Sequence, residues 1–402
     1  MRHNSPRAII IGAGVAGPAL ALFLRRAGVS SAIYEAHAGG EGVGGALNVA
    51  PNGMNVLDAL GLADAVEARG SVGLELCFRN HRGRVLARFG NGAGRFGRPS
   101  VSLMRHDLHA VLAEEMCRQD LPIHYGKRLV GVEGAESPDG VVAHFADGTR
   151  ARGDVLVGAD GIHSRTRSTV FPDAPAPAYV GIIGVGGRVP ASAVPQVTTR
   201  DRRTLNFTFG ARGFFGYIGV GGKDVVWWSN LVRERELTRE ELNDLSADSV
   251  RREILSIYRG YHPPIEALIE HTGPPGKINV FDIRSLPTWR KGRVVLIGDA
   301  AHAVSPNAGQ GASMALEDAA CLAKLLRDTA FDHASAFARF ERCRKPRVER
   351  IVAEGRRRAA DKQAVSPFRS MLRNGILSLV LRLTGERSQD WLYRYRIEWD
   401  RG

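Results

Sequence analysis

Cysteine is scarce in this sequence, with four residues among 402, and none of them forms a CxxC or CxxH pair. This scatter does not fit a disulfide framework and predicts no metal site. The four positions are Cys77, Cys117, Cys321 and Cys343. Long hydrophobic runs are also missing, because glycines and a proline interrupt residues 8–24 and Arg382 interrupts residues 376–383. We therefore expect neither a membrane span nor a secretory leader, and a protein of the reducing cytoplasm.

Acidic residues are fewer than basic ones: the sequence has 42 Asp and Glu and 55 Lys and Arg, which gives a formal net charge of +13. Such a field could attract nucleic acid, an anionic membrane or an acidic small molecule. The alternative is a generally arginine-rich surface, which the wide spread of basic residues favours. The densest stretch, 339–358, is interleaved with Glu341, Glu349 and Glu354, as is typical of a solvated helix face. No aromatic-plus-basic motif occurs, so we expect no nucleic-acid partner.

The hydrophobic pattern predicts an α/β chain in which two domains are interleaved. A buried strand over 7–11, a glycine-rich turn and a helix over 15–26 lead to a second strand at 31–34. Buried strands return at 155–157 and 294–297. Between these segments the sequence predicts antiparallel strands, at 74–78, 84–89, 205–209, 214–220 and 225–230.

The first motif is GAGVAG over residues 12–17, between the first strand and the first helix. Gly12 permits a tight turn, Gly14 lets the backbone approach a pyrophosphate, and Gly17 allows helix and strand to pack closely. The N-terminus of the helix offers free N–H groups to the phosphates. Glu35 ends the second strand, where its carboxylate can accept hydrogen bonds from ribose hydroxyls. The motif predicts dinucleotide binding without separating FAD from NAD.

The second motif is DVLVGADGIHS over residues 154–164. A buried strand delivers Asp160 into a glycine-flanked turn, ahead of Arg165 and Arg167. Asp160 either contacts a ligand or caps the helix that follows. The residues alone leave both interpretations open.

The third motif is GDAAH over residues 298–302, followed by Pro306 and by Gly-Gln-Gly at 309–311. The strand before it places Asp299 at its carboxyl end, where α/β sheets bind ligands. Asp299 could bond a polyol. The glycine turn starts a helix whose N-terminus could face a developing negative charge.

These three motifs, in this order and at this spacing, resemble those of the group A flavoprotein monooxygenases. This family includes para-hydroxybenzoate hydroxylase, salicylate hydroxylase and the tetracycline-inactivating monooxygenases. The resemblance covers roughly residues 6 to 360, and it implies a Rossmann-like FAD-binding domain interleaved with a mainly antiparallel β-sheet substrate domain, plus C-terminal helices. The expected FAD-binding domain comprises 1–72, 101–172 and 286–360, the substrate domain comprises 73–100 and 173–285, and the C-terminal segment is 361–402.

The resemblance implies FAD as the cofactor and a set of residues that contact it. Arg105 would lie near the phosphates or the ribityl chain, and Leu129 would touch adenine through its backbone. Asp160 would support contacts to both FAD and NAD(P)H, and Asp299 would bind the ribityl chain. The expected FAD contacts are Gly12, Gly14, Gly17, Glu35, Gly44, Arg105, Leu129, Asp160, Asp299, Pro306, Gly309 and Gly311.

The resemblance also implies a reaction in two stages. NADPH or NADH reduces FAD, and the reduced flavin adds O2 to form a C4a-hydroperoxide that passes one oxygen to an electron-rich substrate. A reduced flavin is anionic at N1, where the helix N-terminus at 309–311 would stabilise it. The family has no separate nicotinamide domain, and the further GxGxxG strings of this chain, at 40–45 and 92–97, do not lead from a strand directly into a helix.

Three departures from related sequences limit what the resemblance implies about the activity and the substrate. Ser313 stands where an asparagine is usual. Urate-type hydroxylases carry an arginine followed by Pro-Val in the central hairpin, whereas this chain has Phe214 and Gly219-Val220, which disfavours urate. The Trp-x-Trp-x-Ile-Pro string of flavin-dependent halogenases is absent. We expect an aromatic or polycyclic substrate, in secondary metabolism or the breakdown of foreign compounds.

Aromatic residues concentrate in the β-rich segment that would cover the open face of the flavin. Alternation puts Phe207 and Phe209 on one strand face, where they line a pocket or form ordinary sheet core. The polar candidates that could orient a substrate are Asn206, Arg212 and Tyr217. His302 is either a base near the flavin or a structural hydrogen-bonding residue, and no catalytic base is assignable.

An amphipathic helix is predicted over 372–383. In relatives a similar helix bridges the two domains, and the alternative interpretation for this chain is contact with a partner or a membrane. An epoxidase, a Baeyer–Villiger-type oxygenase and a flavin reductase share the fold. A non-catalytic flavin- or ligand-binding protein is the alternative of a different class. We expect a monomer or homodimer without stable membrane insertion, whose partners are the substrate, O2 and NAD(P)H.

Overall fold

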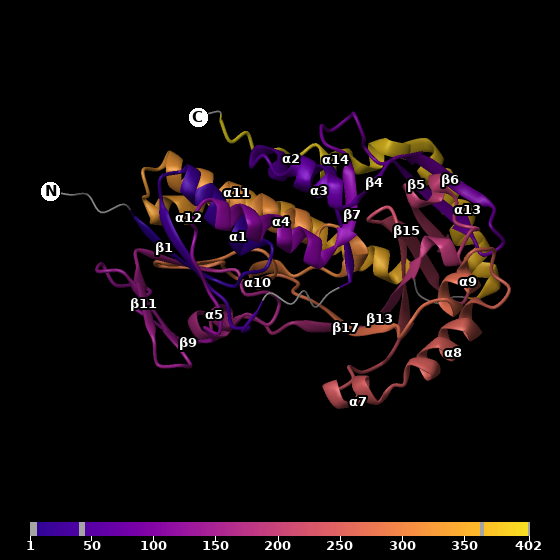
Figure 1. Cartoon of the computed structure of the whole chain (residues 1–402), viewed down its shortest axis with the longest axis horizontal. Helices are drawn as coiled ribbons and strands as arrows, with labels where there is room; N and C mark the ends of the chain where they lie inside the picture. Colours follow the sequence, from indigo (N-terminus) through magenta and orange to yellow (C-terminus); the bar gives the residue numbers. More distant parts are fainter. Residues whose placement is uncertain (1–5, 40–44, 362–365, 401–402) are drawn as a thin grey trace.

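The computed structural model describes residues 6–39, 45–361 and 366–400 (Figure 1). Two large sheets organise the chain, and the C-terminal helices run along both. Gly44, one of the expected FAD contacts, lies outside the described residues.

The first sheet has six strands in the order β18-β19-β12-β1-β2-β8. All neighbouring pairs are parallel except β18–β19. The strands are β1 (Arg7–Ile11), β2 (Ser30–Tyr34), β8 (Ile123–His124), β12 (Val155–Gly158), β18 (Arg290–Lys291) and β19 (Val294–Leu296). The central strands are buried along nearly their whole length, because other layers cover both faces of the sheet.

Helices cover one face of this sheet, and a small three-stranded sheet covers the other (Figure 1). The helices are α1 (Ala16–Arg26), α4 (Arg105–Arg118), α11 (Gly311–Asp328) and α12 (His333–Asp361). The small sheet consists of β9 (Leu129–Glu133), β10 (Val141–Phe145) and β11 (Arg150–Gly153), with α5 (Arg165–Val170) beside it. This three-layer arrangement is the Rossmann-like half of the molecule.

The second sheet has seven strands in the order β17-β13-β16-β15-β14-β5-β6, and all pairs are antiparallel except β14–β5. The strands are β5 (Glu75–Asn80), β6 (Val85–Gly90), β13 (Ala178–Pro190), β14 (Thr204–Phe209), β15 (Phe214–Val220), β16 (Asp224–Val232) and β17 (Gly276–Asp282). One face packs on α8 (Ala247–Tyr258) and α9 (Ile265–Glu270), with α7 (Arg239–Asp244) at its edge. The other face looks toward the Rossmann-like half.

Smaller elements complete the molecule. A third sheet orders its strands β3-β7-β4, with α2 and α3 next to it. Their bounds are β3 (Ala46–Val49), α2 (Pro51–Ala59), α3 (Ala63–Arg69), β4 (Ser71–Gly73) and β7 (Ser100–Met104), and the last helices are α10 (Asp299–His302), α13 (Pro367–Thr384) and α14 (Asp390–Tyr393). The predicted α/β class, with its interleaved sheets and C-terminal helices, is confirmed, whereas the residue boundaries of the two domains stay predictions.

A buried ionic cluster joins α11 to α12. Arg344 is fully buried, and its guanidinium lies 2.7 Å from Asp318 and 2.5 Å from Glu317, both also buried. Asp318 also accepts hydrogen bonds from the Gly298 N–H and from His302. Burial raises the pKa of Asp318, but His302 and Arg344 outweigh this effect and hold it at about 2. The cluster is therefore charged, and it ties the third motif to the helical layer.

Replacing Asp318 with Asn should lower the free energy of unfolding by about 3–5 kcal/mol, because the charge of Arg344 would lose a buried partner. Urea denaturation at neutral pH measures this loss. The matched control is Glu114→Gln in the exposed pair with Arg69, which should cost less than about 1 kcal/mol. Equal losses in the two variants would contradict the role of the buried cluster.

The difference between wild type and D318N should also depend on pH in one direction. Because the pKa of Asp318 lies below its ordinary value of 3.8, its stabilisation is fully present above that pH and is lost as the pH falls toward about 2. Unfolding measured at several pH values should show a constant difference near neutrality that shrinks only in acid.

Candidate functional site

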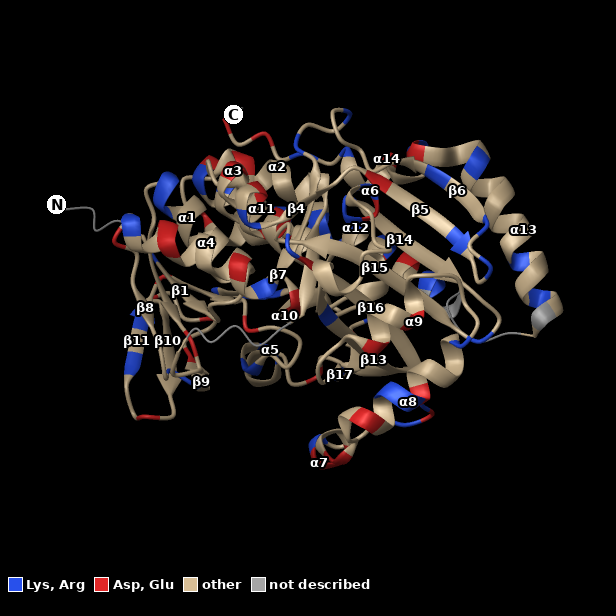
Figure 2. Cartoon of the chain, turned by 45° about the vertical axis from the view of Figure 1, so that its right-hand side comes forward, with Lys and Arg blue, Asp and Glu red and all other residues tan. Residues whose placement is uncertain are grey.

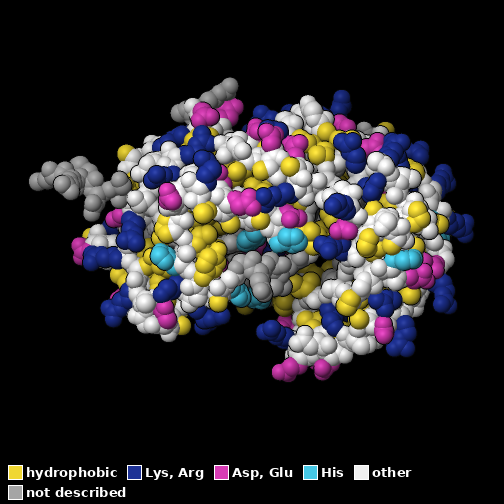
Figure 3. Space-filling model, viewed as in Figure 1, with side chains coloured by type: hydrophobic (Ala, Val, Ile, Leu, Met, Phe, Trp, Pro, Cys, Tyr) yellow, Lys and Arg dark blue, Asp and Glu magenta, His cyan; other side chains and the backbone are white. Residues whose placement is uncertain are grey.

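A cavity of about 2700 Å³ lies between the two large sheets. Ligand pockets usually measure roughly 300–1,000 Å³, so this one can hold a dinucleotide together with a second molecule. Figure 3 shows this face of the molecule hollowed between its two halves, with histidine side chains near the hollow. The histidines that line the cavity are His37, His109 and His163.

The glycine turn after β1 forms one end of the cavity. Gly12 has a φ of +105°, and a Cβ there would lie 2.5 Å from the carbonyl oxygen of Ala159. A Cβ on Gly17 would meet the carbonyl of Gly12, so Gly17 serves packing and does not line the cavity. A Cβ on Gly14 would meet nothing within 4 Å, because it would point into open space. The turn thus exposes its backbone where a pyrophosphate would approach.

Glu35 is held in place by the same turn. One carboxylate oxygen accepts the Ala13 N–H at 2.8 Å, and the other accepts the His37 N–H at 2.9 Å. Helix α1 begins at Ala16 without a side-chain cap, so its first N–H groups stay available to a ligand. The predicted combination of glycine turn, open helix end and acidic residue is therefore brought together at one edge of the cavity.

Several cationic side chains line the cavity, and only Arg105 among them was an expected FAD contact. Arg105, at the start of α4, and Leu129, at the start of β9, are two of the expected FAD contacts, and both line the cavity. Lys127 and Arg128 lie beside Leu129, and Arg165 follows the second motif. The signal was faint, because Arg is common throughout this chain.

Asp160 lines the cavity and also holds its own turn. Its two oxygens accept the Ser164 hydroxyl at 2.5 Å and the Thr166 N–H at 2.9 Å. Burial raises the pKa of Asp160, and these hydrogen bonds offset part of the rise. The nearby guanidinium of Arg167 donates to the carbonyls of Ile162 and Ala300, which ties the second motif to the third.

Asp299 presents its carboxylate to the cavity from the turn after β19. No hydrogen bond from a described residue reaches this carboxylate. Burial raises its pKa, and His302 and Arg105 partly counteract this. A half-buried acceptor that lines the cavity without a protein donor fits a ligand that brings hydroxyl groups, such as a ribityl chain.

The glycine turn at 309–311 starts α11 at the cavity wall. Gly309 adopts a left-handed conformation with a φ of +62°, and the following helix has no side-chain cap. Its free N–H groups and the positive end of an 18-residue helix dipole therefore face the cavity, where Pro306, Gly309 and Gly311 all contribute to the lining. Ser313 replaces the usual asparagine and packs on Gly53, where a Cβ would already lie 2.6 Å from its hydroxyl.

The second sheet forms the opposite wall with aromatic side chains. Phe207 packs between Phe78 and Trp228, at ring distances of 5.2 and 6.1 Å. Trp228 lies over the backbone of Gly216, where a Cβ would be 2.5 Å from the indole. These aromatic residues line the cavity, which favours the pocket interpretation over ordinary core for this face.

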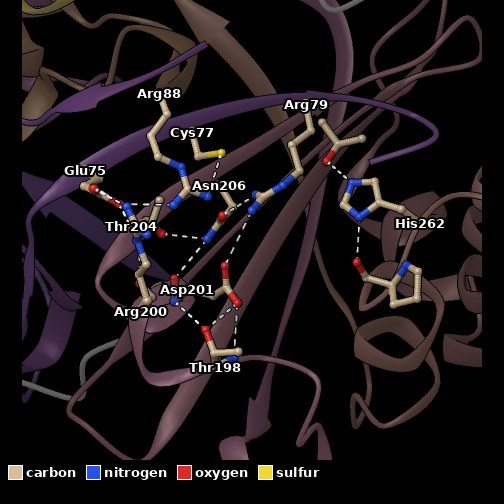
Figure 4. Close-up of polar contacts among 12 residues, drawn as sticks. Glu75, Cys77, Arg79, Arg88, Thr198, Arg200, Asp201, Thr204, Asn206 and His262 are labelled. Carbon is tan, nitrogen blue, oxygen red and sulfur yellow. Dashed lines mark hydrogen bonds and ion pairs between the residues drawn. The ribbon is translucent and has the colours of Figure 1, made fainter. Parts of the chain in front are cut away.

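The other face of the same strands carries residues that do not line the cavity. Figure 4 shows Asn206 turned toward Arg79 and Asp201, and its amide bonds the Arg79 guanidinium at 2.7 Å. Tyr217 is 2% exposed and packs in the core beneath α8. Burial raises its pKa. Because side chains alternate along a strand, residues 206 and 217 point away from the wall formed by Phe207.

Two further candidates are engaged elsewhere. Arg212 donates to the carbonyls of Ser256 and Arg259, outside the lining of the cavity. His302 is 3% exposed, lies 2.5 Å from Asp318 and packs on Trp289. Neither Arg212 nor His302 lines the cavity, and these contacts favour the structural interpretation of His302.

The model of the FAD binding domain family matches residues 6–354. The chain belongs to this family. A 6-hydroxynicotinate 3-monooxygenase of Pseudomonas fluorescens is 32% identical over 87% of the chain and 90% of that relative. A 3-amino-4-hydroxybenzoate 2-monooxygenase of Streptomyces platensis is 33% identical over 99% of the chain and 98% of that relative.

Solved structures agree with this family assignment. HpxO of Klebsiella pneumoniae, complexed with FAD and uric acid, superimposes with a TM-score of 0.83 at 27% identity, covering 96% of each chain. The predicted membership among the FAD-dependent aromatic hydroxylases and the predicted cofactor FAD are thereby confirmed. Among the described residues, no helix has the length and apolarity that crossing a membrane requires.

Replacing Gly14 with Val should weaken FAD binding by roughly tenfold or more, because the side chain would enter the space left for the pyrophosphate. Flavin retention and titration of the apoprotein measure the affinity. The stability of the apoprotein should stay near the wild-type value, since nothing lies within 4 Å of that Cβ. Gly17→Ala is the contrasting variant, which should destabilise the fold through its clash with Gly12. Wild-type FAD affinity in G14V would contradict this assignment.

Proposed function

We propose that this chain is an FAD-dependent monooxygenase that uses NADPH or NADH and O2 to hydroxylate an aromatic or polycyclic small molecule. The observation that carries the proposal is the pairing of two unlike cavity walls. One wall offers the unpartnered Asp299 and the open N-terminus of α11, and the other offers the aromatic face around Phe207. The relatives named for 6-hydroxynicotinate and 3-amino-4-hydroxybenzoate support a small ring substrate.

The residues expected to hold FAD surround the cavity from the glycine turn to α11. Gly14 and the start of α1 would receive the pyrophosphate, Glu35 the adenosine ribose and Asp299 the ribityl chain. When bound, FAD accepts a hydride from reduced nicotinamide and activates O2 so that one oxygen atom is transferred. The N–H groups at the start of α11 would stabilise negative charge on the bound ring.

The chain's own contribution on the substrate side is binding and exclusion of water. Phe207, Phe209 and Trp228 offer flat apolar surfaces that stack on an aromatic ring and orient its plane. The urate-type arginine and Pro-Val are missing from β15, which carries Phe214 and Gly219-Val220 instead, so we propose a substrate other than urate. No residue is proposed as a catalytic base.

Mass spectrometry under ¹⁸O2 tests the proposal on a panel of aromatic acids, phenols and polycyclic compounds. A substrate that stimulates NAD(P)H oxidation should gain one oxygen atom from O2. A reduced product without labelled oxygen would indicate a flavin reductase, and product structures would separate hydroxylation from epoxidation and Baeyer–Villiger insertion. A flavin-bound protein whose NAD(P)H oxidation responds to no candidate would favour a ligand-binding role.

Replacing Phe207 with Ala should raise the KM of an aromatic substrate by roughly tenfold, since the ring loses a stacking partner, while FAD affinity stays unchanged. The matched control is Phe215→Ala on the opposite face, which is fully buried away from the cavity. That variant should lose about 3–5 kcal/mol of stability and keep its KM. Steady-state kinetics and thermal unfolding together separate the two effects. An unchanged KM in F207A would contradict the placement of the substrate.

A further inference from the structure

Helix α13 exposes large apolar side chains and buries polar ones, which is the reverse of the usual arrangement in a surface helix. Among the described residues, thirteen large hydrophobic side chains are exposed, and seven of them lie on this one helix. These seven residues are called the α13 stripe: Phe368, Met371, Leu372, Ile376, Leu379, Val380 and Leu383. Ser370 and Asn374, in contrast, are only 5% and 8% exposed. Surface helices normally turn their apolar side inward, so this helix is built to have its outer side covered.

The exposed surface is too large to be incidental. The stripe residues are between 47% and 77% exposed, and they follow one another along 18 helical residues. Together they form a patch on the order of several hundred Å², the size at which exposed apolar surface marks a binding site. The helix is nonetheless fixed to the body, because Ser378 and Arg382 donate to the carbonyl of Leu86 and Arg373 donates to that of Gly210.

The positive charge on and beside α13 indicates what kind of partner would cover the stripe. Helix α13 contains Arg369, Arg373 and Arg382 and no acidic residue. The exposed Arg82 and Arg84 lie in the turn just before Leu86, on which the helix rests. Figure 2 shows the helix at the outer edge of the molecule, with Lys and Arg positions marked blue along its ribbon. An apolar stripe bordered by the exposed Arg369, Arg82 and Arg84 matches an anionic lipid surface, in which the apolar side chains insert while these guanidinium groups meet the headgroups.

We propose that α13 docks this protein on an anionic lipid bilayer, lying in the plane of the interface with the stripe inserted. Helix α13 lacks the combination of length and apolarity that crossing a bilayer requires, so the docking is peripheral and reversible. Leu372, Ile376 and Val380 also line the cavity, so a molecule dissolved in the lipid reaches the cavity along the docked helix. That consequence rests on the proposed function, whereas docking itself does not.

Co-sedimentation of the FAD-loaded protein with vesicles tests the docking. Vesicles of phosphatidylcholine with about one-third phosphatidylserine should retain the protein, and vesicles of phosphatidylcholine alone should retain roughly tenfold less. Raising the ionic strength should weaken the binding. The double variant Leu379→Glu, Leu383→Glu changes two stripe residues that do not line the cavity and should lose the binding.

The matched control is the double variant Val130→Glu, Val232→Glu, which adds the same charge at two exposed apolar positions elsewhere. It should bind vesicles to within about twofold of wild type, and both variants should keep their flavin spectrum, which shows that they fold. Vesicle binding that survives L379E/L383E, or that is absent for wild type, overturns the proposal. A wild-type dimer in sedimentation that L379E/L383E dissociates, without vesicle binding, assigns the stripe to a second copy and also overturns it. Because the assay needs no turnover, its failure is distinct from failure of the proposed function.

Discussion

The buried ionic cluster between α11 and α12 is the constraint on which the cavity depends. Asp318 accepts the Gly298 N–H and the His302 side chain, and in this way it fixes the turn from which Asp299 faces the cavity. Its neighbour Glu317 accepts a hydrogen bond from Asn52, which holds α2 against the same helix. Because isolated buried charge is costly, these groups are stable only together, and their mutual positions are thereby set.

The two walls of the cavity differ in chemistry, because one carries carboxylates and the other carries aromatic side chains. On the Rossmann-like side, parallel strands end at one edge, so Glu35, Asp160 and Asp299 meet there although far apart in sequence. On the other side, side chains alternate between the two faces of β14. Phe207 faces the cavity, whereas Asn206 joins the polar network on the reverse face (Figure 4). The proposed cofactor contacts and the proposed substrate contacts thus belong to separate sheets.

Local signals predicted the Rossmann-like strands, the glycine turns and the family, because each depends on residues close together in sequence. Strand β13 was not predicted, since four glycines at 181, 184, 186 and 187 remove the alternation that marks a strand. The sequence also could not tell which face of β15 is covered, so Tyr217 was expected near a substrate and lies in the core beneath α8. Cys321 and Cys343 are far apart in sequence, yet α11 and α12 bring their sulfurs within 3.4 Å. Such proximity arises only from tertiary packing.

The strand order of the first sheet has a consequence for how the protein is made. Strand β1 is synthesised first, yet its neighbour β12 pairs Leu156 with Ile9, and β19 pairs Val294 with Leu156 in turn. At roughly 5–20 residues per second, a ribosome needs about 15–60 s to reach β19 after β1 has emerged. Strand β1 can pair with β2 early and with β12 about halfway through that interval, whereas β12 lacks β19 and α1 lacks α11 until its end. The parallel sheet and its helical cover can therefore be completed only when the last third of the chain has been translated.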